Sequence, residues 1–344
     1  DALGTRRTMV AGLVLLSLAG ALGGFADTPA VLLALRACEG VGFLMATLPA
    51  PALIRRLVDP ARLGSTMGLW GAYMPVGTAL ALLLGPAAIA MTGWQGWWWL
   101  LAALSLAMAG WLWLAVPATL DARRPGPAGA NRGRIARTLR APGPWLLSLA
   151  FAAYSAQWLA VIGFLPTIYA QSGLPAVYAA PASALVAAVN IFGNLGAGRA
   201  LQRGIRPSAL LQAGYVAMAF GAILAFAPWS DSSAPAVLAV RYAGVLLFSM
   251  LGGMIPATLF WLAVRLAPDE GAVSTTVGWV QQWSSFGQFA GPPLAALVAA
   301  RTGGWSGTWW VTASFAAGGI VVAAAIARLL RRRAAAPPPA GSRS

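Results

Sequence analysis

The sequence has no lysine and no histidine, and it contains one cysteine, Cys38. A single cysteine excludes a disulfide within the chain, and a metal site made of His and Cys ligands is not expected. Charged residues form only 9% of the 344 residues, whereas a soluble domain has about 25%. So few charges cannot cover a globular surface of this size in water, which disfavours a soluble fold.

Apolar residues predominate over charged ones in this chain. They make up 59% of the sequence, and the mean hydropathy is +0.73. They occur in continuous runs close to the roughly 20 residues of a bilayer-spanning helix, and not in the alternating segments of about ten that mark membrane strands. We therefore predict an all-α polytopic membrane protein. The ten runs lie at about 9–26, 30–54, 66–91, 97–116, 145–171, 178–198, 209–228, 236–262, 273–299 and 307–330.

The arginines are distributed unevenly among the loops. Twenty of the 23 lie before the first run or after an even-numbered run, while the opposite loops hold only Arg301, beside Asp27 and Asp231. By the positive-inside rule, both ends of the chain are expected in the cytoplasm and the protein in the plasma or inner cell membrane. The net charge of +15 then reflects topology, and nucleic-acid binding is not expected.

One long polar stretch, residues 118–144, divides the runs into four and six. We predict a four-helix part at 1–117, a cytoplasmic central loop at 118–144, a six-helix part at 145–333 and a cytoplasmic tail at 334–344. The Pro, Gly and Arg content of the loop favours a flexible linker. The alternative is a cationic helix over 131–140, lying on the anionic inner leaflet.

Two stretches about 205 to 210 residues apart share an order of features. Each stretch begins at an arginine, Arg36 or Arg241, followed by apolar residues, and continues through Pro-Ala to a basic exit before a proline. Each then has Ser-Thr followed by Gly, and Thr-Gly ahead of tryptophans. Two repeated halves joined by a basic loop are typical of transporters, with a small-molecule substrate bound between the halves at the midplane.

Short motifs add a family resemblance. The opening DALGTRR resembles the end of the major facilitator signature, found between the second and third helices of that superfamily. GAGRALQRGIR, residues 196–206, resembles its second-half copy, and RACEGVG resembles the fourth-helix signature. The match departs from the family pattern at Thr5 and at Gln202, which replace an arginine and an acid. The fifth-helix stretch GLWGAYMPVG lacks the Gly-Pro pair of the antiporter signature.

This resemblance implies a major facilitator-type fold of two bundles. The family has twelve helices, so the ten runs would be helices three to twelve, and the first two would be missing from this chain. The resemblance also implies a cytoplasmic latch that holds one conformation, formed by Asp1, Gly4, Arg6, Arg7, Arg199 and Arg203. The stretches YSAQWLAVIGFLPTIYAQSG and GWVQQWSSFGQFAGPP loosely resemble the cyanate and nitroimidazole branch of the family.

Arg36 and Glu39 are charges inside an apolar run, where an ionised group costs a few kcal/mol. Three interpretations stay open. The two residues, at i and i+3, form a structural pair. Alternatively, Arg36 joins Arg241 in a cavity that attracts anions. In the third, Glu39 takes up and releases a proton for coupling, with Arg36 adjusting its pKa.

Other residues within the runs could contact a substrate. Side-chain amides avoid lipid, and their ordinary role is hydrogen bonding between helices. The amides that fall in mid-run are the better candidates, together with two aromatic residues. The candidates are Gln157, Asn190, Gln281, Tyr73 and Trp283.

The predicted function is secondary active transport of a small polar solute, an organic or inorganic anion, by alternating access. No Walker loop is present and no cofactor is expected, and without histidine a catalytic cluster of an enzyme is not expected either. Protons are the candidate coupling ion, and the protein is expected to be a monomer in the lipid bilayer. The alternatives are efflux of drugs or metabolites by proton antiport, and a truncated binding or sensor protein that does not transport.

Overall fold

The computed structural model describes residues 4–59, 66, 69–118, 130–229 and 234–335. Every regular element in these ranges is a helix, and none of them is a strand. The all-α prediction is therefore confirmed. The chain divides into two compact units, residues 1–73 with 80–131 and residues 74–79 with 132–344. The predicted boundaries at 117 and 144 stay a prediction.

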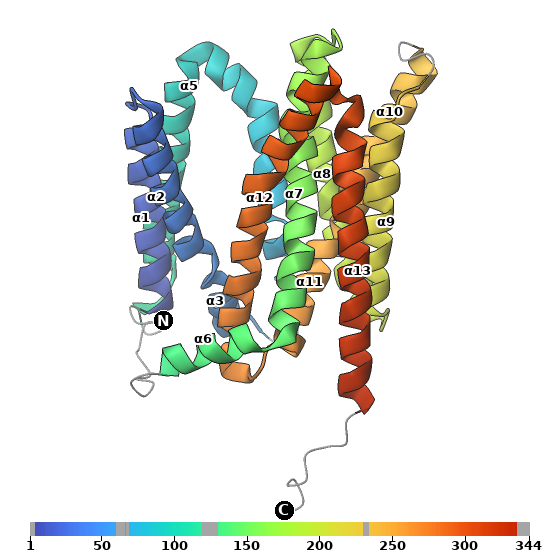
Figure 1. The fold of residues 1–344 in the computed structure, drawn as a ribbon. Helices are drawn as coiled ribbons and strands as arrows, with labels where there is room; N and C mark the ends of the chain where they lie inside the picture. Colours follow the sequence, from blue (N-terminus) through green and yellow to red (C-terminus); the bar gives the residue numbers. More distant parts are fainter. Residues whose placement is uncertain (1–3, 60–65, 67–68, 119–129, 230–233, 336–344) are drawn as a thin grey trace, which may run out of the picture. The chain divides into compact units, whose positions relative to one another are not determined.

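The first unit contains α1 (Thr5–Gly23), α2 (Pro29–Thr47), α3 (Ala50–Leu57) and all of α5 (Tyr73–Ala115) except residues 74–79. The 43-residue α5 follows an arch (Figure 1) because Gly93 leaves the helical region, at φ 72° and ψ 171°. Few residues other than glycine adopt this conformation. The bend separates the predicted runs 66–91 and 97–116.

The second unit contains α6 (Ala130–Arg140) from residue 132 onward, and this helix lies across the direction of α7 and α12 (Figure 1). Its remaining elements are α7 (Pro142–Gln171), α8 (Ala176–Gln202), α9 (Pro207–Phe226), α10 (Pro235–Gly252), α11 (Met254–Leu266), η2 (Glu270–Ala272), α12 (Val273–Thr302), η3 (Trp305–Gly307) and α13 (Thr308–Ala335).

Eight helical stretches among the described residues are long and apolar enough to cross a membrane. The bent α5 counts once among the eight but contains two of the predicted runs. The 30-residue α12 is not one of the eight, because glutamines, serines and threonines dilute its apolar residues. These two features account for the difference between eight stretches and ten predicted runs.

Two predicted runs are each broken into two helices. Run 30–54 becomes α2 and α3, and run 236–262 becomes α10 and α11. In both cases the first helix ends four residues before a proline, at Thr47 before Pro51 and at Gly252 before Pro256. Proline has no N–H to donate to the carbonyl four residues earlier, so the helix is weakened at that point. The two halves thus share a break as well as a sequence pattern.

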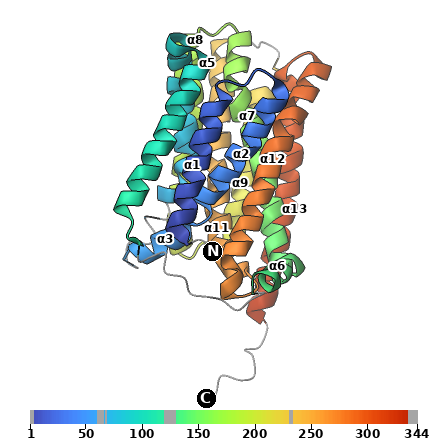
Figure 2. The ribbon, with the colours of Figure 1, turned by 90° about the vertical axis from the view of Figure 1, so that its left-hand side faces the viewer.

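Glycine contacts hold equivalent helix pairs together in both units. In the first unit, a Cβ on Gly12 would lie 2.6 Å from the Gly42 carbonyl oxygen, so α1 and α2 touch backbone to backbone (Figure 2). In the second unit, Gly221 of α9 meets Gly244 of α10 in the same way. A Cβ on Gly221 would lie 2.5 Å from the Gly244 carbonyl oxygen. Small residues allow such close packing of membrane helices.

The predicted central loop contains a helix in its second half. α6 covers residues 130–140 and is attached to the second unit by an ion pair between Arg137 Nε and Asp269 Oδ2, at 2.7 Å. Trp145 Nε1 also donates to the Leu139 carbonyl at 2.8 Å. The alternative of a helix within the loop is therefore the one that the structure shows for residues 130–140. The position of this helix on the inner leaflet stays a prediction.

Candidate functional site

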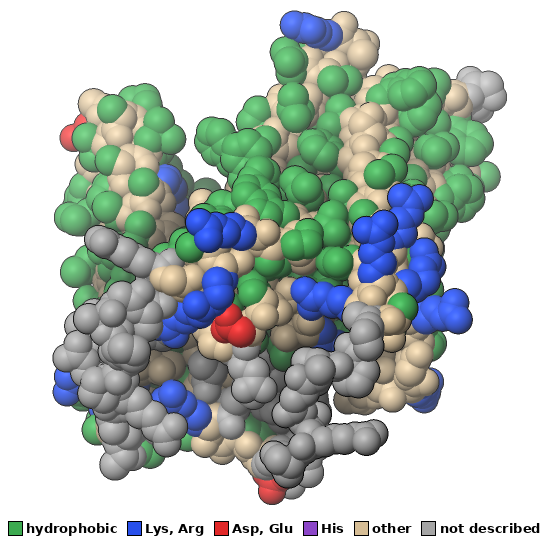
Figure 3. Space-filling view, turned by 60° about the horizontal axis from the view of Figure 1, so that its bottom comes forward, with side chains coloured by type: hydrophobic (Ala, Val, Ile, Leu, Met, Phe, Trp, Pro, Cys, Tyr) green, Lys and Arg blue, Asp and Glu red, His purple; other side chains and the backbone are tan. Residues whose placement is uncertain are grey.

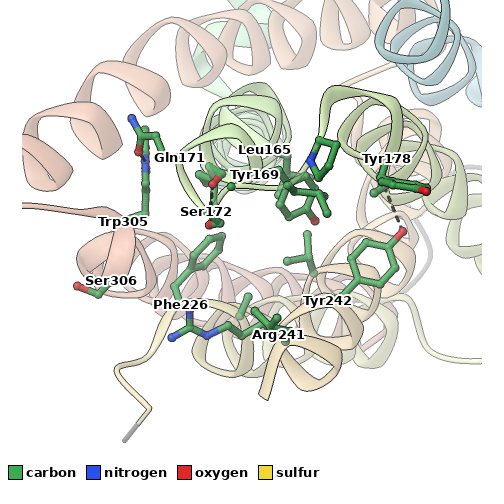
Figure 4. Close-up of a pocket in the computed structure, with 18 residues that line it drawn as sticks. Leu165, Tyr169, Gln171, Ser172, Tyr178, Phe226, Arg241, Tyr242, Trp305 and Ser306 are labelled. Atoms are coloured by element: carbon green, nitrogen blue, oxygen red, sulfur yellow. Dashed lines mark hydrogen bonds between the residues drawn. The ribbon is translucent and has the colours of Figure 1, made fainter. Parts of the chain in front are cut away.

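A cavity of about 630 Å³ opens within the second unit. It is lined by the end of α7, the start of α8, the end of α9, the first half of α10 and by η3. Figure 4 shows Arg241 and Tyr242 of α10 on one side, with Leu165 and Tyr169 of α7 opposite them. Pockets of about 300–1,000 Å³ are the usual size of small-molecule sites.

The turn between α7 and α8 forms one rim of this cavity. α7 ends at Gln171, and Gly173 adopts a left-handed φ of 78° that reverses the chain before Pro175. Gln171 Oε1 accepts a hydrogen bond from Trp305 Nε1 at 2.7 Å, which joins the end of α7 to η3. On the far side, Tyr242 Oη donates to the Ala182 carbonyl at 3.2 Å, which joins α10 to α8. Four segments distant in sequence are thus held around one space.

Arg241 is the only charged residue that lines the cavity among the described residues. Its Nε is buried and has no hydrogen-bond partner, and the buried hydroxyl of Tyr169 has none either. The acid nearest to Arg241 in sequence, Asp231, lies outside the described residues. A buried donor without an acceptor is costly, and a permanent cation in an apolar setting more so. The cavity is therefore suited to a ligand that carries acceptor oxygens and negative charge.

Arg36 has a different environment, in the first unit. Its guanidinium forms an ion pair with Glu39 and lies 4.2 Å from the ring centre of Trp98, in the second half of α5. The side chains of Arg36 and Glu39 are 40% and 15% exposed. The predicted pair is therefore formed, and a cation–π contact adds to it. The three interpretations of these residues remain predictions.

Asn190 lies in a hydrogen-bond network inside the second unit. Its Nδ2 donates to Tyr154 Oη at 3.1 Å and to the Ser249 carbonyl at 2.7 Å, and its Oδ1 accepts from Asn194 at 2.9 Å. Trp158 Nε1 adds a bond to Ser249 Oγ at 3.2 Å. This network joins α7, α8 and α10, so Asn190 makes the interhelical bonds expected of an intramembrane amide.

The remaining substrate candidates are spread over both units and do not line the cavity. Gln157 is fully buried, with Nε2 bonded to the Ala153 carbonyl and Oε1 without a partner. Gln281 is buried in α12. Trp283 packs against Trp145, with ring centres 5.6 Å apart. In the first unit, the Tyr73 ring lies 6.1 Å from that of Phe43.

The predicted latch residues lie at helix ends where they are described. Asp1 is outside the described residues. Gly4 precedes α1 with a φ of 86°, and the buried Arg6 donates to the Trp113 carbonyl and covers the Trp113 ring at 4.0 Å. Arg7 of α1, Arg199 in the last turn of α8 and Arg203 just after it are exposed. Their action as a latch stays a prediction.

Sequence reasoning found Arg241 but missed Tyr169, Gln171, Tyr242 and Trp305. Aromatic residues near helix ends are common at membrane interfaces. Their positions could therefore be explained without a binding role, and they were not singled out. Tyr242 directly follows Arg241 in the sequence, and this adjacency could have identified it as a residue of the same site. The contact between Gln171 and Trp305, 134 residues apart, had no signal in the sequence.

The helices and their small-residue contacts define a polytopic membrane protein built of two helical units. Residues 1–286 match the model of the Major Facilitator Superfamily. The chain belongs to this superfamily, which is one of transporters and not of enzymes, as the sequence predicted.

Solved structures of the superfamily share the fold. The E. coli fucose:proton symporter FucP is 16% identical, with a TM-score of 0.68 over 93% of this chain and 83% of that one. A bacterial homologue of the human lysosomal transporter Spinster, in an inward-facing and occupied conformation, is 18% identical, with a TM-score of 0.67 over 97% and 84%. At this identity the likeness concerns the fold alone.

A curated relative matches a shorter region. The puromycin resistance protein pur8 of Streptomyces alboniger is 39% identical over 103 residues, which is 29% of this chain. The match spans 20% of the length of that relative.

Proposed function

We propose that the chain is a secondary active transporter that moves a small anion across the membrane by alternating access. The observation that carries this proposal is Arg241, a cation in a cavity lined by no acid among the described residues, with a buried Nε that has no acceptor. An intramembrane arginine without a protein partner is typical of a substrate pathway. Family membership supports transport, and the arginine supports the negative charge of the solute.

Several further properties belong to the same proposal. The protein is a monomer in the plasma or inner cell membrane, with both ends in the cytoplasm. Glu39 is the candidate proton carrier, because it is the only carboxylate within the predicted apolar runs. The name of FucP, a fucose:proton symporter, provides a precedent in the fold for coupling to protons.

Uptake into proteoliposomes tests this proposal. Benzenesulfonate, benzenesulfonamide and trimethylphenylammonium form a matched anionic, neutral and cationic set, and the sulfonate does not leak across the bilayer as a neutral acid. We expect saturable uptake of the anion alone, driven by a pH gradient and reduced about tenfold or more by Arg241→Gln, as for loss of a charged hydrogen bond. Equal uptake of all three solutes would refute anion transport. Uptake of none of them would favour the binding or sensor alternative.

Efflux of a drug by proton antiport is the second candidate, and the similarity to the puromycin resistance protein favours it. Expression in a puromycin-sensitive host should then raise the tolerated concentration, and Glu39→Gln should abolish the gain. Unchanged sensitivity, with the protein present in the membrane, would exclude puromycin as a substrate.

A further inference from the structure

The helix α6 runs across the direction of α7 and α12, at the end of the second unit where α7 begins (Figure 1). Membrane-spanning helices lie within about 40° of the bilayer normal, so a helix that crosses their ends lies roughly in the plane of the membrane surface. Helices in that plane bury an apolar face at the boundary of headgroups and acyl chains and carry basic residues beside it. Both features are present in α6.

Contacts with the rest of the second unit determine which side of α6 faces inward. Arg137 Nε pairs at 2.7 Å with Oδ2 of Asp269, in the turn between α11 and α12, and the Thr138 side chain is buried. Trp145 Nε1, in the first turn of α7, donates to the Leu139 carbonyl at 2.8 Å. The helix is therefore held against the start of α7 and the turn before α12. Its opposite side is open within the part of the chain that the structure describes.

Two apolar side chains lie next to each other on that open side. Ile135 and Leu139 stand four residues apart, which places them on one face of a helix, and they are 50% and 38% exposed. Contact with water is unfavourable for two adjacent apolar side chains, whereas the outer edge of the acyl region of a bilayer would cover them. Trp145, which bonds to Leu139, is of a residue type that is enriched at this depth. The apolar part of the surface is thus suited to lipid.

The charged side chains of the same segment are all basic. Residues 133–140 contain three arginines and no acid. Arg137 has Asp269 as its partner, whereas the exposed Arg140 has no acid partner among the described residues. Further arginines stand at the ends of α8, α11 and α13 on this side of the unit. Positive charge beside an apolar pair is complementary to a molecule with an anionic head and apolar chains.

We infer that the open side of α6 binds an anionic phospholipid of the adjacent leaflet, with the lipid phosphate at Arg140 and the acyl chains against Ile135 and Leu139. A dissolved anion would contact the arginine and leave the apolar pair in water. A zwitterionic lipid would cover the pair, but its own cation would offset the attraction of its phosphate to the arginine. An anionic phospholipid satisfies both parts of the surface. The inference concerns a surface outside the cavity around Arg241 and does not depend on which solute is transported.

Quenching by spin-labelled lipids tests the inference at the surface itself. In the full 344-residue chain, Cys38→Ser removes the single cysteine, and Ile135→Cys then carries a bimane fluorophore on the open side of α6. The protein is placed in phosphatidylcholine nanodiscs that contain the same small fraction of doxyl-labelled phosphatidylglycerol or doxyl-labelled phosphatidylcholine. We expect the phosphatidylglycerol to quench as if its local concentration were about fivefold or more above that of the phosphatidylcholine, since one arginine already contributes that factor beside an anionic lipid.

Variants assign the lipid preference to α6. Arg140→Gln should reduce the local enrichment of phosphatidylglycerol about fivefold. Arg301→Gln is the matched control, because it removes an exposed arginine at the other end of α12, and it should leave the enrichment unchanged. With the fluorophore moved to Gly133→Cys, two residues away and so on a different side of the helix, neither lipid should quench.

Each other outcome overturns the inference. Equal quenching by the two lipids, or an equal effect of Arg140→Gln and Arg301→Gln, shows that the surface does not recognise an anionic lipid. Quenching by iodide in place of either lipid shows that position 135 faces water. Quenching by none of the three shows that protein covers it, for example a second copy of the chain. Uptake of solute by proteoliposomes is measured separately, so the inference and the proposed function can fail independently.

Discussion

At the scale of single residues, the two intramembrane arginines differ in what surrounds them. Arg36 pairs with Glu39 and lies over the Trp98 ring, whereas the buried Nε of Arg241 has no hydrogen-bond partner among the described residues. The cost of a charge in an apolar setting is offset internally for Arg36. For Arg241, no such internal compensation reaches the buried Nε among the described residues.

A double-mutant cycle tests the pair in the first unit. Glu39→Gln should destabilise the protein, because it removes the carboxylate that pairs with the Arg36 charge. Arg36→Gln with Glu39→Gln should recover part of that loss, with a coupling free energy of about 0.5–3 kcal/mol. Thermal unfolding of the purified variants in detergent measures the stability of the single and the double variant. If the two effects simply add, the pair contributes nothing to stability.

At the scale of helices, contact between small residues determines which faces meet. Gly287 and Gly291, one turn apart on α12, face the carbonyl oxygens of Ala152 and Ala156 on α7. Such small-xxx-small spacing lets two backbones approach closely. Ser155 Oγ and Ser284 Oγ, 2.7 Å apart, add a hydrogen bond within the same interface. This interface holds α7, whose end forms the rim of the cavity.

Gly291→Ala should disrupt that interface, since the added Cβ would overlap the Ala156 carbonyl oxygen. We expect a loss of unfolding free energy of about 1–3 kcal/mol, typical of overpacking. Gly163→Ala on α7 is the control, because nothing lies within 4 Å of its Cβ position. It should be neutral or stabilising by about 0.5–1 kcal/mol, as alanine favours helix over glycine. Equal melting temperatures for the two variants would contradict the packing argument.

At the scale of the whole molecule, charge distribution is the dominant feature. In the second unit, arginines gather at the end where α8 and α11 finish and where α7 and α9 begin, and Figure 3 shows basic side chains over this end. They are Arg134, Arg137, Arg140, Arg199, Arg203, Arg206, Arg265, Arg331, Arg332 and Arg333. Arg333 Nη1 also donates to the Arg265 carbonyl at 3.0 Å. The concentration of basic charge at one end supports the predicted orientation.

Reporter fusions test this orientation. Green fluorescent protein at the C-terminus should fluoresce, because it folds in the cytoplasm and not after export in unfolded form. Alkaline phosphatase fused after Gly303, in the turn between α12 and η3, should be active, because that turn lies at the opposite end. The reverse result for both reporters would place the basic end outside the cell.

Much of the fold could be predicted from the sequence. Runs of apolar residues with few charges have only the membrane helix as a stable outcome, because every backbone polar group must be satisfied within the segment. The orientation that the loop arginines indicate stays a prediction. The repeated Pro-Ala marked both broken helices, although the breaks at Thr47 and Gly252 were not foreseen. The helix within the central loop was only an alternative, because Gly and Pro content argued for a linker.

The sequence by itself determined the class of the molecule: a helical membrane protein with charges at the helix ends and two arginines within the apolar runs. The sequence suffices for this because hydropathy, charge and proline each affect the conformation and environment of the segment that contains them. Only the tertiary structure decided which polar residues pair. Asn190 bonds to Tyr154 and Ser249, and Gln171 bonds to Trp305, whereas the buried Nε of Arg241 has no hydrogen-bond partner among the described residues. Such partners come from distant segments, so packing between helices, and not sequence spacing, determines which polar groups are paired.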